Sequence, residues 1–423
     1  MKKQPLVLAM ISAMSVTSNA WAGPHGFDLH NTIMPASQAM AGTSHARPQD
    51  LPSAIFGNPA TLTQYDGGTR FTFGASFYMP QVVIDHDGTV NGGFPFREKS
   101  GTDVFPVPIV GVAQDLQGLG IPAVLGLGVT ATSGVGATFV DDPKSLGAGA
   151  EFIVFGVNAG AGFPITENLS LGAMATISFA QIDAGLSSTS KETHDLGLRL
   201  TAGLTYDIGN TTIGLWGQTE QKHNFDNLFQ TGVDGDGFPT FSNQKIEQPW
   251  NVGISIANSD LLNGDLLVAF DYIHKAYGDA AFWQDVWEDQ DVFSLGLQWN
   301  PGKRNWVWRA GVGFAEDPNR SDASKLGDLT QVVAGPAGGG NPLLANVVPI
   351  NTVTVPFLQA TQTVIIYEWR AGLGFGYRNF LMPGLDVDVG LGWEFAESRT
   401  FGGHTEADTW SKHLGAALTW NFK

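Results

Sequence analysis

The strongest constraint in this sequence is a period of two, in which apolar side chains alternate with small or polar ones. From Leu414 to Phe422 every second residue is apolar or small, and the same rhythm recurs in 385–395 and 367–377. Because successive side chains of a strand point to opposite faces, each such segment predicts a strand with one apolar face. The pattern predicts fourteen strands, at 69–79, 103–115, 122–137, 150–164, 168–184, 194–207, 211–224, 245–257, 264–276, 290–300, 304–316, 358–378, 383–397 and 410–422.

A soluble β-sandwich and a transmembrane β-barrel both show this alternation. Three further features of the sequence decide between these two folds. Aromatic residues gather near strand ends, as in the girdles of membrane barrels; they include Trp299, Trp306, Trp308, Trp420 and Phe422. The opposite faces carry Gly, Ser, Thr and charged groups, which suit a wet lumen. Connections after odd-numbered strands are long, and those after even-numbered strands, such as 208–210, are short. The sequence therefore predicts an all-β fold, a 14-stranded antiparallel transmembrane β-barrel over residues 69–423 with both termini periplasmic.

Composition narrows the possible functions. The chain has 54 Gly in 423 residues, 15% charged residues and a formal net charge of −18. That charge argues against binding to nucleic acid. The chain has no Cys, which excludes a disulfide framework and a thiolate metal site. An EF-hand beginning at Asp234 would need Glu where Lys245 stands, so we expect no metal and no cofactor.

Residues 1–22 have the features of a secretory signal peptide. Lys2 and Lys3 precede an apolar stretch, and Ala20-Trp21-Ala22 supplies a small-x-small cleavage site. No later window is long and apolar enough for a transmembrane helix. Together with the period of two, this predicts the outer membrane of a Gram-negative bacterium.

Residues 23–68 precede the first alternating segment and do not follow its period. Fourteen strands enclose a bore between that of side-chain-filled eight-stranded barrels and that of open porins. An empty bore of this size would leak water, so we expect residues 23–68 to form an N-terminal hatch inside the lumen. A periplasmic extension is the alternative.

Within this segment Asn58-Pro59-Ala60 stands just before the first strand, in the run 49–63. This stretch, together with 39–43, 167–173 and 308–312, resembles the FadL family of outer-membrane transporters for long-chain fatty acids and hydrophobic aromatic compounds. The resemblance implies capture at extracellular loops, a lumen pocket beside the start of the hatch, and lateral exit through a gap made by a kinked third strand. On the third strand, Ser133 and Gly134 are the candidate kink, since glycine within a strand often marks a bulge. Alternatively, the strand's glycines simply fill inward positions.

Two long loops carry apolar side chains suited to hydrophobic cargo. The candidate capture residues are Phe225, Leu228, Phe229, Phe238, Phe241, Leu343, Leu344 and Val348. Loops that pack on each other would have the same composition.

Three arginines point inward by the alternation and are candidate partners for a ligand carboxylate: Arg199, Arg309 and Arg370. Ion pairs with inward carboxylates of the lumen are the alternative. An aromatic hydrocarbon would need no such partner, so the sequence leaves fatty acids and aromatic hydrocarbons both open.

We therefore expect a monomeric, non-enzymatic transporter of hydrophobic molecules whose surroundings are outer-membrane lipid and lipopolysaccharide. The alternatives are a general porin for polar solutes and a structural or adhesin barrel. A further alternative is a lipase using Ser411 and His413, for which no orienting acid is evident in the sequence.

Overall fold

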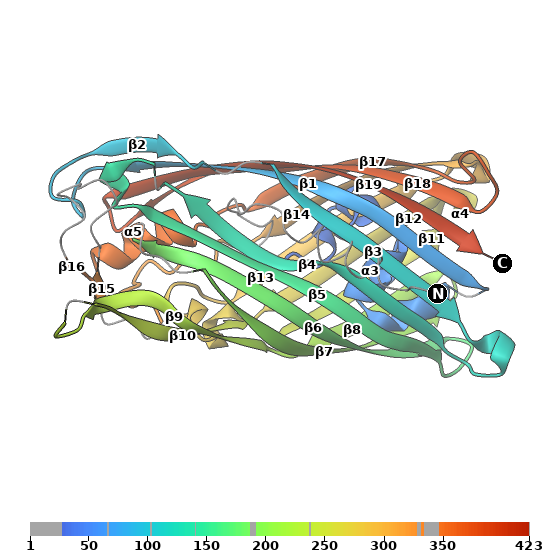
Figure 1. The fold of residues 1–423 in the computed structure, drawn as a ribbon. Helices are drawn as coiled ribbons and strands as arrows, with labels where there is room; N and C mark the ends of the chain where they lie inside the picture. The colour runs from blue at the N-terminus through green and yellow to red at the C-terminus, as the bar shows by residue number, and fades with distance from the viewer. Residues whose placement is uncertain are drawn as a thin grey trace.

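The computed structural model describes residues 28–65, 67–101, 104–139, 141–186, 192–236, 238–327, 331–333 and 347–422. The predicted signal peptide lies outside these residues. Within them, fourteen antiparallel strands form one closed sheet (Figure 1). In chain order they are β1 (Thr69–His86), β3 (Phe105–Asp115), β4 (Val124–Thr138), β5 (Ala148–Pro164), β6 (Leu169–Leu186), β7 (Thr193–Ile208), β8 (Thr211–Gln218), β11 (Asn251–Asp260), β12 (Leu266–Lys275), β13 (Gln290–Trp299), β14 (Trp306–Ala315), β17 (Trp369–Tyr377), β18 (Leu385–Phe401) and β19 (Thr405–Phe422).

The ring closes where the last strand meets the first. β1 and β19 pair over their full lengths, from Thr69↔Phe422 to His86↔Thr405. This pairing leaves no free edge on β1 or β19 at the closure, which matters in a bilayer because an unpaired backbone group there has no water to bond. The prediction of a closed 14-stranded antiparallel barrel is confirmed.

The two ends of the barrel differ in the length of their connections (Figure 1). One end has short turns, some containing a helical turn: η3 (Gln117–Leu119), α4 (Leu261–Gly264) and η7 (Pro301–Lys303). The other end has longer connections with secondary structure of their own. These are β2 (Phe96–Lys99), η4 (Pro143–Ser145), β9 (Gln221–Val233), β10 (Pro239–Gln248), η5 (Tyr277–Asp279), η6 (Trp283–Asp285), β15 (Gln331–Val333), β16 (Val347–Pro349) and α5 (Thr354–Gln362).

Three of the predicted strand boundaries are wrong. The segment 358–378 begins in the helix α5, and its strand starts only at Trp369. All nine residues of α5 are buried, so helix packing inside the barrel overrides the local alternation. The segments 211–224 and 245–257 each cross a break, because β9 and β10 leave the wall and pair with each other as a hairpin. Pro249, which has no N–H to donate, stands at the second break.

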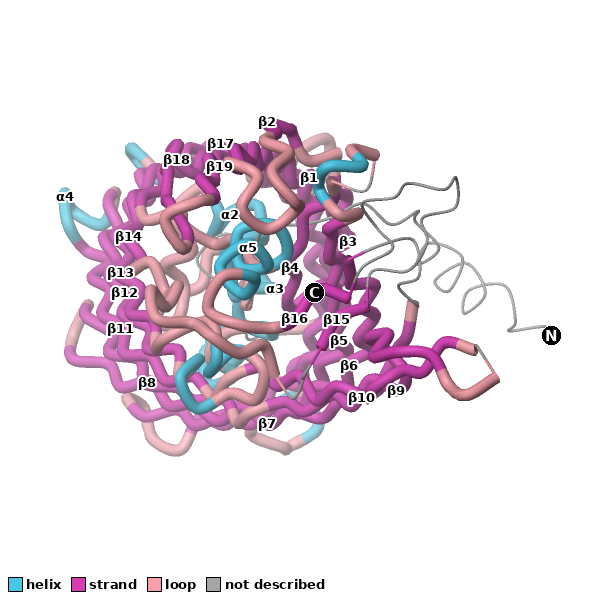
Figure 2. Tube along the Cα trace, turned by 90° about the vertical axis from the view of Figure 1, so that its left-hand side faces the viewer, coloured by secondary structure: helices cyan, strands magenta, loops and turns pink. Residues whose placement is uncertain are grey.

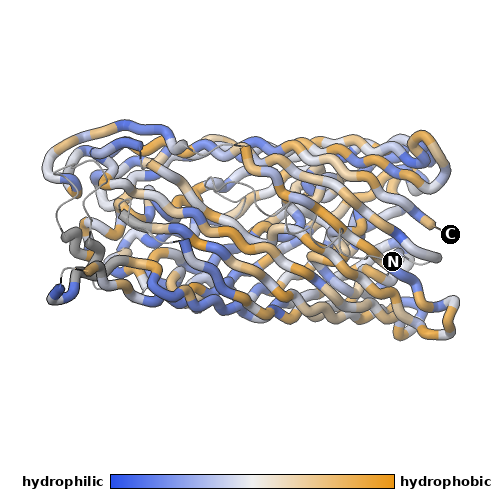
Figure 3. The backbone as a smooth tube through the Cα atoms, in the orientation of Figure 1, coloured by the Kyte–Doolittle hydropathy of each residue, from blue (hydrophilic) through white to orange (hydrophobic). Residues whose placement is uncertain are grey.

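The outer face of the wall is apolar and exposed, as the alternation requires. Large side chains on it include Phe73, Ile177 and Leu198, which are 58%, 60% and 60% exposed. Figure 3 shows hydrophobic residues alternating with less hydrophobic ones along the strands. No helix among the described residues has the length and hydropathy needed to cross a membrane.

The residues before β1 form a compact inner segment, residues 28–65, inside the ring (Figure 2). It contains η1 (His30–Ile33), α2 (Pro35–Gln38), α3 (Leu51–Phe56) and η2 (Pro59–Gln64). Glycines of the wall leave room for its backbone. A Cβ on Gly172 would lie 2.3 Å from the carbonyl carbon of Pro59, and one on Gly390 would lie 2.1 Å from the carbonyl oxygen of Pro35. The inward glycines therefore allow the backbone of the inner segment to pack directly against the wall.

The rest of the bore, toward the long connections, is filled by an apolar cluster that we call the loop cluster. It joins α5 and the connections to inward side chains of β4 and β5. Trp283 and Trp287, two of its members, stack with their ring centres 4.2 Å apart. Its members include Val135, Phe139, Phe152, Phe225, Leu228, Phe229, Ile246, Tyr277, Phe282, Leu326, Phe357, Leu358 and Phe401.

Candidate functional site

Among the described residues of the wall, the neighbouring strands β3 and β4 both continue past the point where their pairing with each other stops. β3 and β4 are paired from Asp115↔Val124 to Val110↔Val129. Beyond Val129, β4 pairs only with β5, while β3 continues to pair with β1. Figure 1 shows the two ribbons separating. No strand pairing joins β3 and β4 across this interval, although Thr130 Oγ1 on β4 donates to the Pro108 carbonyl oxygen on β3 at 2.9 Å.

A β-bulge lies just past the point of separation. The register of β4 against β5 shifts between Ala131 and Ser133, so that Thr132 is an extra residue. From Ser133 to Ala137 every residue is buried, and the exposed–buried alternation of a wall strand ends. A bulge bends its strand and increases the local twist. The two residues suggested as a kink, Ser133 and Gly134, directly follow the bulge.

The start of the inner segment docks on this bulge. The Leu29 N–H donates to the carbonyl oxygen of Thr132 at 3.0 Å, and Asp28 forms an isolated antiparallel bridge with Ser133. The Ser133 hydroxyl donates to Asp28 Oδ1 at 2.8 Å and accepts from Gln248 Nε2 at 2.5 Å. These bonds supply partners for part of the backbone that β3 no longer pairs.

Asp28 is also held from the opposite side of the bore. Its Oδ2 accepts from Asn251 Nδ2 at 2.8 Å and lies 3.5 Å from Arg199 Nη2. Its carbonyl oxygen accepts from Lys275 Nζ at 3.0 Å, and its N–H donates to the Tyr277 hydroxyl at 3.2 Å. With 1% of its surface exposed, Asp28 is a buried carboxylate whose partners come from five different elements or connections.

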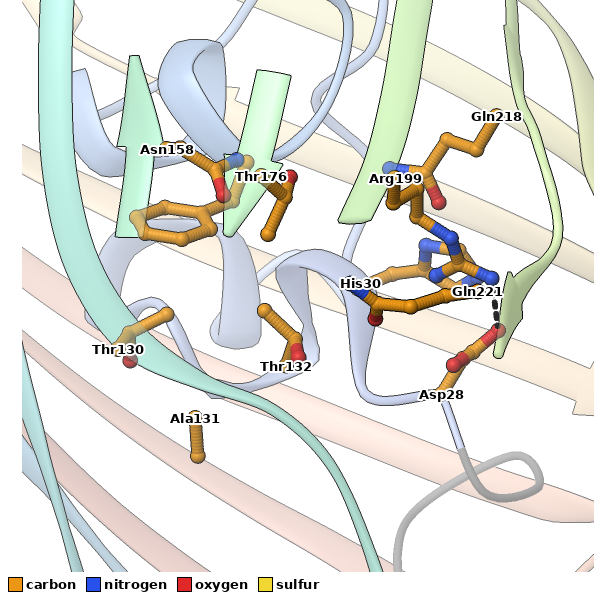
Figure 4. Close-up of a pocket in the computed structure, with 11 residues that line it drawn as sticks. Asp28, His30, Thr130, Ala131, Thr132, Asn158, Thr176, Arg199, Gln218 and Gln221 are labelled. Atoms are coloured by element: carbon orange, nitrogen blue, oxygen red, sulfur yellow. Dashed lines mark ion pairs between the residues drawn. The ribbon is translucent and has the colours of Figure 1, made fainter. Parts of the chain in front are cut away.

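A narrow cavity of about 20 Å³, enough for about one water molecule, lies beside this junction (Figure 4). Most of its lining residues are polar, although the cargo expected from the loops is apolar. The lining residues are Asp28, His30, Phe56, Thr130, Ala131, Thr132, Asn158, Thr176, Arg199, Gln218 and Gln221. They belong to the inner segment, to β4–β8 and to the start of β9.

Several polar atoms of this lining have no hydrogen-bond partner among the described residues. They are His30 Nε2, Asn158 Oδ1, Gln218 Oε1 and both side-chain polar atoms of Gln221. Burial lowers the pKa of His30 well below its ordinary value, and the Lys275 charge adds to the effect, so its ring is neutral at pH 7. Leaving a buried polar atom unsatisfied costs about 1–3 kcal/mol. The cavity is thus suited to water or to a ligand group that can hydrogen-bond.

The three inward arginines are all buried, but they occupy different surroundings. Arg309 pairs with Asp388 at 2.7 Å and donates to Gln298 at 2.7 Å, the lumen ion pair that was the alternative to a ligand contact. Arg370 lies against Gly42, and its Nε and Nη2 have no partner among the described residues. Of the three, only Arg199 lines the cavity, where Nε donates to the Thr219 carbonyl at 2.9 Å and Nη2 donates to that of Pro249.

The candidate capture residues lie in different environments. Phe225, Leu228 and Phe229 are buried in the loop cluster, and Phe225 packs edge-on against Phe152 with ring centres 5.5 Å apart. Phe238, near the tip of the β9–β10 hairpin, is 68% exposed, and Phe241 is half-buried. Leu343 and Leu344 fall outside the described residues, and Val348 is placed only as part of the backbone of β16.

The Asn58-Pro59-Ala60 motif ties the inner segment to itself and to the wall. Asn58 Oδ1 accepts from the Ala60 N–H at 3.1 Å and so caps η2. Its Nδ2 donates to the carbonyl oxygens of His45 at 2.9 Å and of Leu204, on β7, at 3.1 Å. Proline supplies the fixed φ at the first helical position.

Ser411 and His413 lie within hydrogen-bond distance, 3.1 Å between Oγ and Nε2. An acid is present: Glu394 Oε2 accepts from Ser411 Oγ at 2.5 Å, and Oε1 lies 3.4 Å from the same Nε2. In a catalytic triad the acid instead bonds the other ring nitrogen. His413 Nδ1 has no partner among the described residues. All three side chains are buried, and the arrangement lacks the orientation of a hydrolase.

Sequence reasoning missed Glu394, Asp28 and Gln221 as parts of these clusters. Glu394 faces Ser411 through the β18–β19 register. Asp28 meets Ser133 across 105 residues of chain. The inward parity of Glu394 is visible in the sequence, whereas no sequence signal pairs Asp28 with the third wall strand.

No protein-family model and no curated protein matches this sequence. Solved structures with the same fold do exist. The toluene transporter TodX of P. putida has 16% identity and a TM-score of 0.63, covering 94% of this chain and 99% of its own. A Pseudomonas aeruginosa FadL homologue has 14% identity and a TM-score of 0.65, covering 94% and 100%. The toluene transporter TbuX of Ralstonia pickettii has 14% identity and a TM-score of 0.61, covering 94% and 99%.

These structural likenesses extend over nearly the whole length of each protein. At 14–16% sequence identity they show that the fold is shared. The fold that the resemblance to the FadL family implied is thereby confirmed. This chain has the fold of the FadL homologue and of the toluene transporters TodX and TbuX.

Proposed function

We propose that this chain is an outer-membrane channel of the FadL type, which admits hydrophobic small molecules passively and releases them sideways through its wall. The observation that carries the proposal is the unpaired interval between β3 and β4, with a cavity directly behind it. The structural neighbours support it, since two of them are toluene transporters and one is a FadL homologue. Residues 23–68 act in this proposal as the hatch.

The proposed route has three stages. An apolar molecule first enters among the apolar side chains of the loop cluster, where leaving water contributes about 25 cal/mol per Å² of apolar surface. It then reaches the small cavity beside Asp28 and Arg199, which has to widen to admit it. Finally it leaves between β3 and β4 into the bilayer, so that it need not pass the inner segment. Downhill partitioning drives each stage, and the proposed activity is transport rather than catalysis.

The filled bore argues against a general porin for polar solutes. In the half nearer the short turns, the backbone of the inner segment packs against wall glycines. In the half nearer the long connections, the bore holds the buried apolar side chains of the loop cluster. We expect the protein to be nearly silent in planar bilayers, whereas a porin would conduct ions readily. A structural or adhesin barrel would leave uptake of fatty acids and toluene unchanged when its gene is deleted.

The test is to straighten the bulged strand. Deleting Thr132 removes the extra residue and allows β4 to continue beside β3. We expect cells carrying this deletion to lose uptake of radiolabelled toluene and oleate. A matched control is available in β18, which has its own register shift between Glu394 and Glu397. Deletion of Ala396 there should leave uptake intact.

Both deletions must first give a folded barrel, which is checked by the difference in gel mobility between heated and unheated samples. If folded protein without Thr132 still supports normal uptake, lateral exit at β3–β4 is wrong. Wild-type protein that supports uptake of neither probe would overturn the transport assignment itself.

A further inference from the structure

We propose that the outer face of the wall binds one phospholipid, with the phosphate on Arg304 and an acyl chain in a groove beside the turn between β17 and β18. The site goes beyond the proposed function, because it lies on the bilayer-facing side of β14, β17 and β18, a different part of the ring from the β3–β4 interval. It gives the protein a lipid ligand that stays bound, in addition to a cargo that passes through.

The groove lies where the turn of residues 378–384 meets the wall. It has a volume of about 640 Å³, and apart from Asn379 its lining side chains are apolar or aromatic. Tyr377 and Val387 line it from the wall, and these two residues are directly paired between β17 and β18. Ligand pockets typically have volumes of about 300–1,000 Å³, so the groove is large enough for an acyl chain.

The turn holds an exposed leucine beside this groove. Leu381 is 82% exposed, and its backbone lies in the left-handed region, with a φ of 61°, which branched residues rarely adopt. The Phe380 N–H donates to the Leu385 carbonyl oxygen at 2.6 Å and helps to hold this conformation. The Gly384 N–H donates to Asn379 Oδ1 at 2.8 Å on the other side of the turn. An apolar side chain held outward in this way gains about 25 cal/mol per Å² when acyl chains rather than water cover it.

A cation without a protein partner stands next to the groove. The guanidinium carbon of Arg304 lies 5.8 Å from the centre of the Trp306 ring, and the Arg304 side chain has no hydrogen bond or ion pair among the described residues. Trp306 is directly paired with Tyr377, which lines the groove. Arginine binds phosphate through two parallel N–H···O hydrogen bonds. The cation and the groove are therefore placed to hold the head group and one chain of the same lipid.

Aromatic rings place Arg304 at the depth of the lipid head groups. The Trp306 ring contacts those of Trp299 and Trp308, with ring centres 6.3 and 6.0 Å apart. Trp and Tyr gather at the level of the head groups on both sides of a membrane. A guanidinium over Trp306 is therefore at the depth where a phospholipid carries its phosphate.

The acidic groups nearby leave the charge of this cation available. Asp386 and Asp388 interact with Arg378, with N–O distances of 3.8 and 2.9 Å. Asp265, on the neighbouring turn, accepts from a backbone N–H at 2.7 Å. A phosphate that reaches Arg304 therefore meets a positive charge that no carboxylate of the described residues already pairs.

The experiment compares three radiolabelled probes on the purified full-length barrel in detergent micelles and measures how much of each is retained. Dioleoylphosphatidylglycerol has both a phosphate and acyl chains, dioleoylglycerol lacks the phosphate, and glycerol phosphate lacks the chains. We expect the barrel to retain a single phosphatidylglycerol and to bind dioleoylglycerol about fivefold more weakly, the contribution of one basic residue at a lipid surface. Glycerol phosphate should not be retained.

Two variants test the two halves of the site. Arg304→Gln should lower the affinity for dioleoylphosphatidylglycerol by about the same factor. Its matched control is Lys144→Gln, which removes one exposed positive charge at the other end of the barrel and should leave the affinity unchanged. Val387→Trp fills the groove and should abolish retention of the lipid. Val252→Trp adds the same bulk on the outer face of β11 and should not.

Each variant is first shown to be a folded barrel by its gel mobility with and without heating. Equal retention of phosphatidylglycerol and dioleoylglycerol, or an unchanged affinity in Arg304→Gln, would overturn the phosphate contact and with it the site. Full retention by folded Val387→Trp would overturn the groove as the place of the acyl chain. None of these outcomes depends on uptake of toluene or oleate, so failure of this proposal is distinguishable from failure of the proposed function.

Discussion

The two halves of the bore are filled by different kinds of contact. In the half nearer the short turns, backbone of the inner segment rests on glycines of the wall, as Pro35 does on Gly390 and Pro59 on Gly172. In the other half, aromatic and aliphatic side chains of the connections form the loop cluster. An apolar ligand can replace an apolar side chain at little cost, but it cannot replace a backbone seated on backbone. In the proposed function, cargo therefore exchanges with the loop cluster while the body of the inner segment stays in place.

The largest expected effect comes from making a hole in the loop cluster. Phe357 on α5 is fully buried, with its ring 5.0 Å from that of His86. Phe357→Ala should lower the free energy of unfolding by about 3–5 kcal/mol, measured by urea titration in micelles. Because dry apolar cavities bind small aromatic molecules, excess toluene should restore part of the loss.

Phe73→Ala on the exposed outer face is the matched control. We expect it to change the free energy of unfolding far less than Phe357→Ala does and to show no recovery with toluene. Equal losses in the two variants would mean that the loop cluster contributes no more than the outer surface. Failure of toluene to restore Phe357→Ala would argue against exchange of ligand with the cluster.

The next effect concerns His223 of β9, at the boundary between the two halves. Its Nε2 lies 3.0 Å from Ser178 Oγ, and burial lowers its pKa to about 4. Between pH 6.5 and 4 the unfolded chain binds a proton that the folded protein does not. Stability is therefore retained above pH 6.5 and falls as the pH drops toward 4, by about 3 kcal/mol in total.

Urea titrations at pH 7.5 and 4.5 measure this loss. His223→Gln should reduce the difference between the two pH values, although the buried His30 leaves a remainder. Replacing the exposed His194 by Gln is the control and should leave the difference unchanged. A His223→Gln protein with the full wild-type pH dependence would contradict the assignment.

The smallest expected loss of stability comes from the wall glycines that contact the backbone of the inner segment. A substitution there tests most directly whether this segment closes its half of the bore. In Gly172→Ala the new Cβ would lie 2.3 Å from the backbone of Pro59 and Ala60, which cannot rotate away. We expect a loss of about 1–3 kcal/mol and, as the inner segment lifts, a measurable ion conductance in planar bilayers. Gly217→Ala is the control, because its nearest neighbour, the Asn251 carbonyl oxygen, is 3.5 Å away. Silent bilayers with Gly172→Ala would show that the segment adapts without opening the bore.

Much of the wall could be predicted because strand periodicity is a local property. The alternation locates β13 to within one residue, and it locates β1 and β19 correctly except that β1 runs on to His86 and β19 begins already at Thr405. Prediction failed where chain segments left the wall. Residues 354–362 form the helix α5, which is buried on all sides inside the barrel. An alternation with a period of two predicts only strands with one buried face, so it could not predict this helix. The β9–β10 hairpin kept its alternation but changed its pairing partner.

The candidate site divides in the same way. Arg199, Ser133 and the Asn58 motif were visible as residues, since parity and chain position already marked them as inward or at a turn. Their partners were not visible. Asp28 bonds to Ser133 and Asn251, which lie 105 and 223 residues away along the chain. That the side-chain amide of Gln221 lines the cavity can be seen only in the folded structure.

That this chain forms a closed wall with an apolar exterior follows from its residues alone, because side-chain alternation and hydrogen-bond closure are consequences of local chemistry. Where the wall loses its pairing, which carboxylate docks there and which arginine faces the cavity could be learned only from the folded molecule. Those features depend on register between strands and on contacts across the bore. Alternation sets the face of each residue, but only the assembled ring sets what stands opposite it.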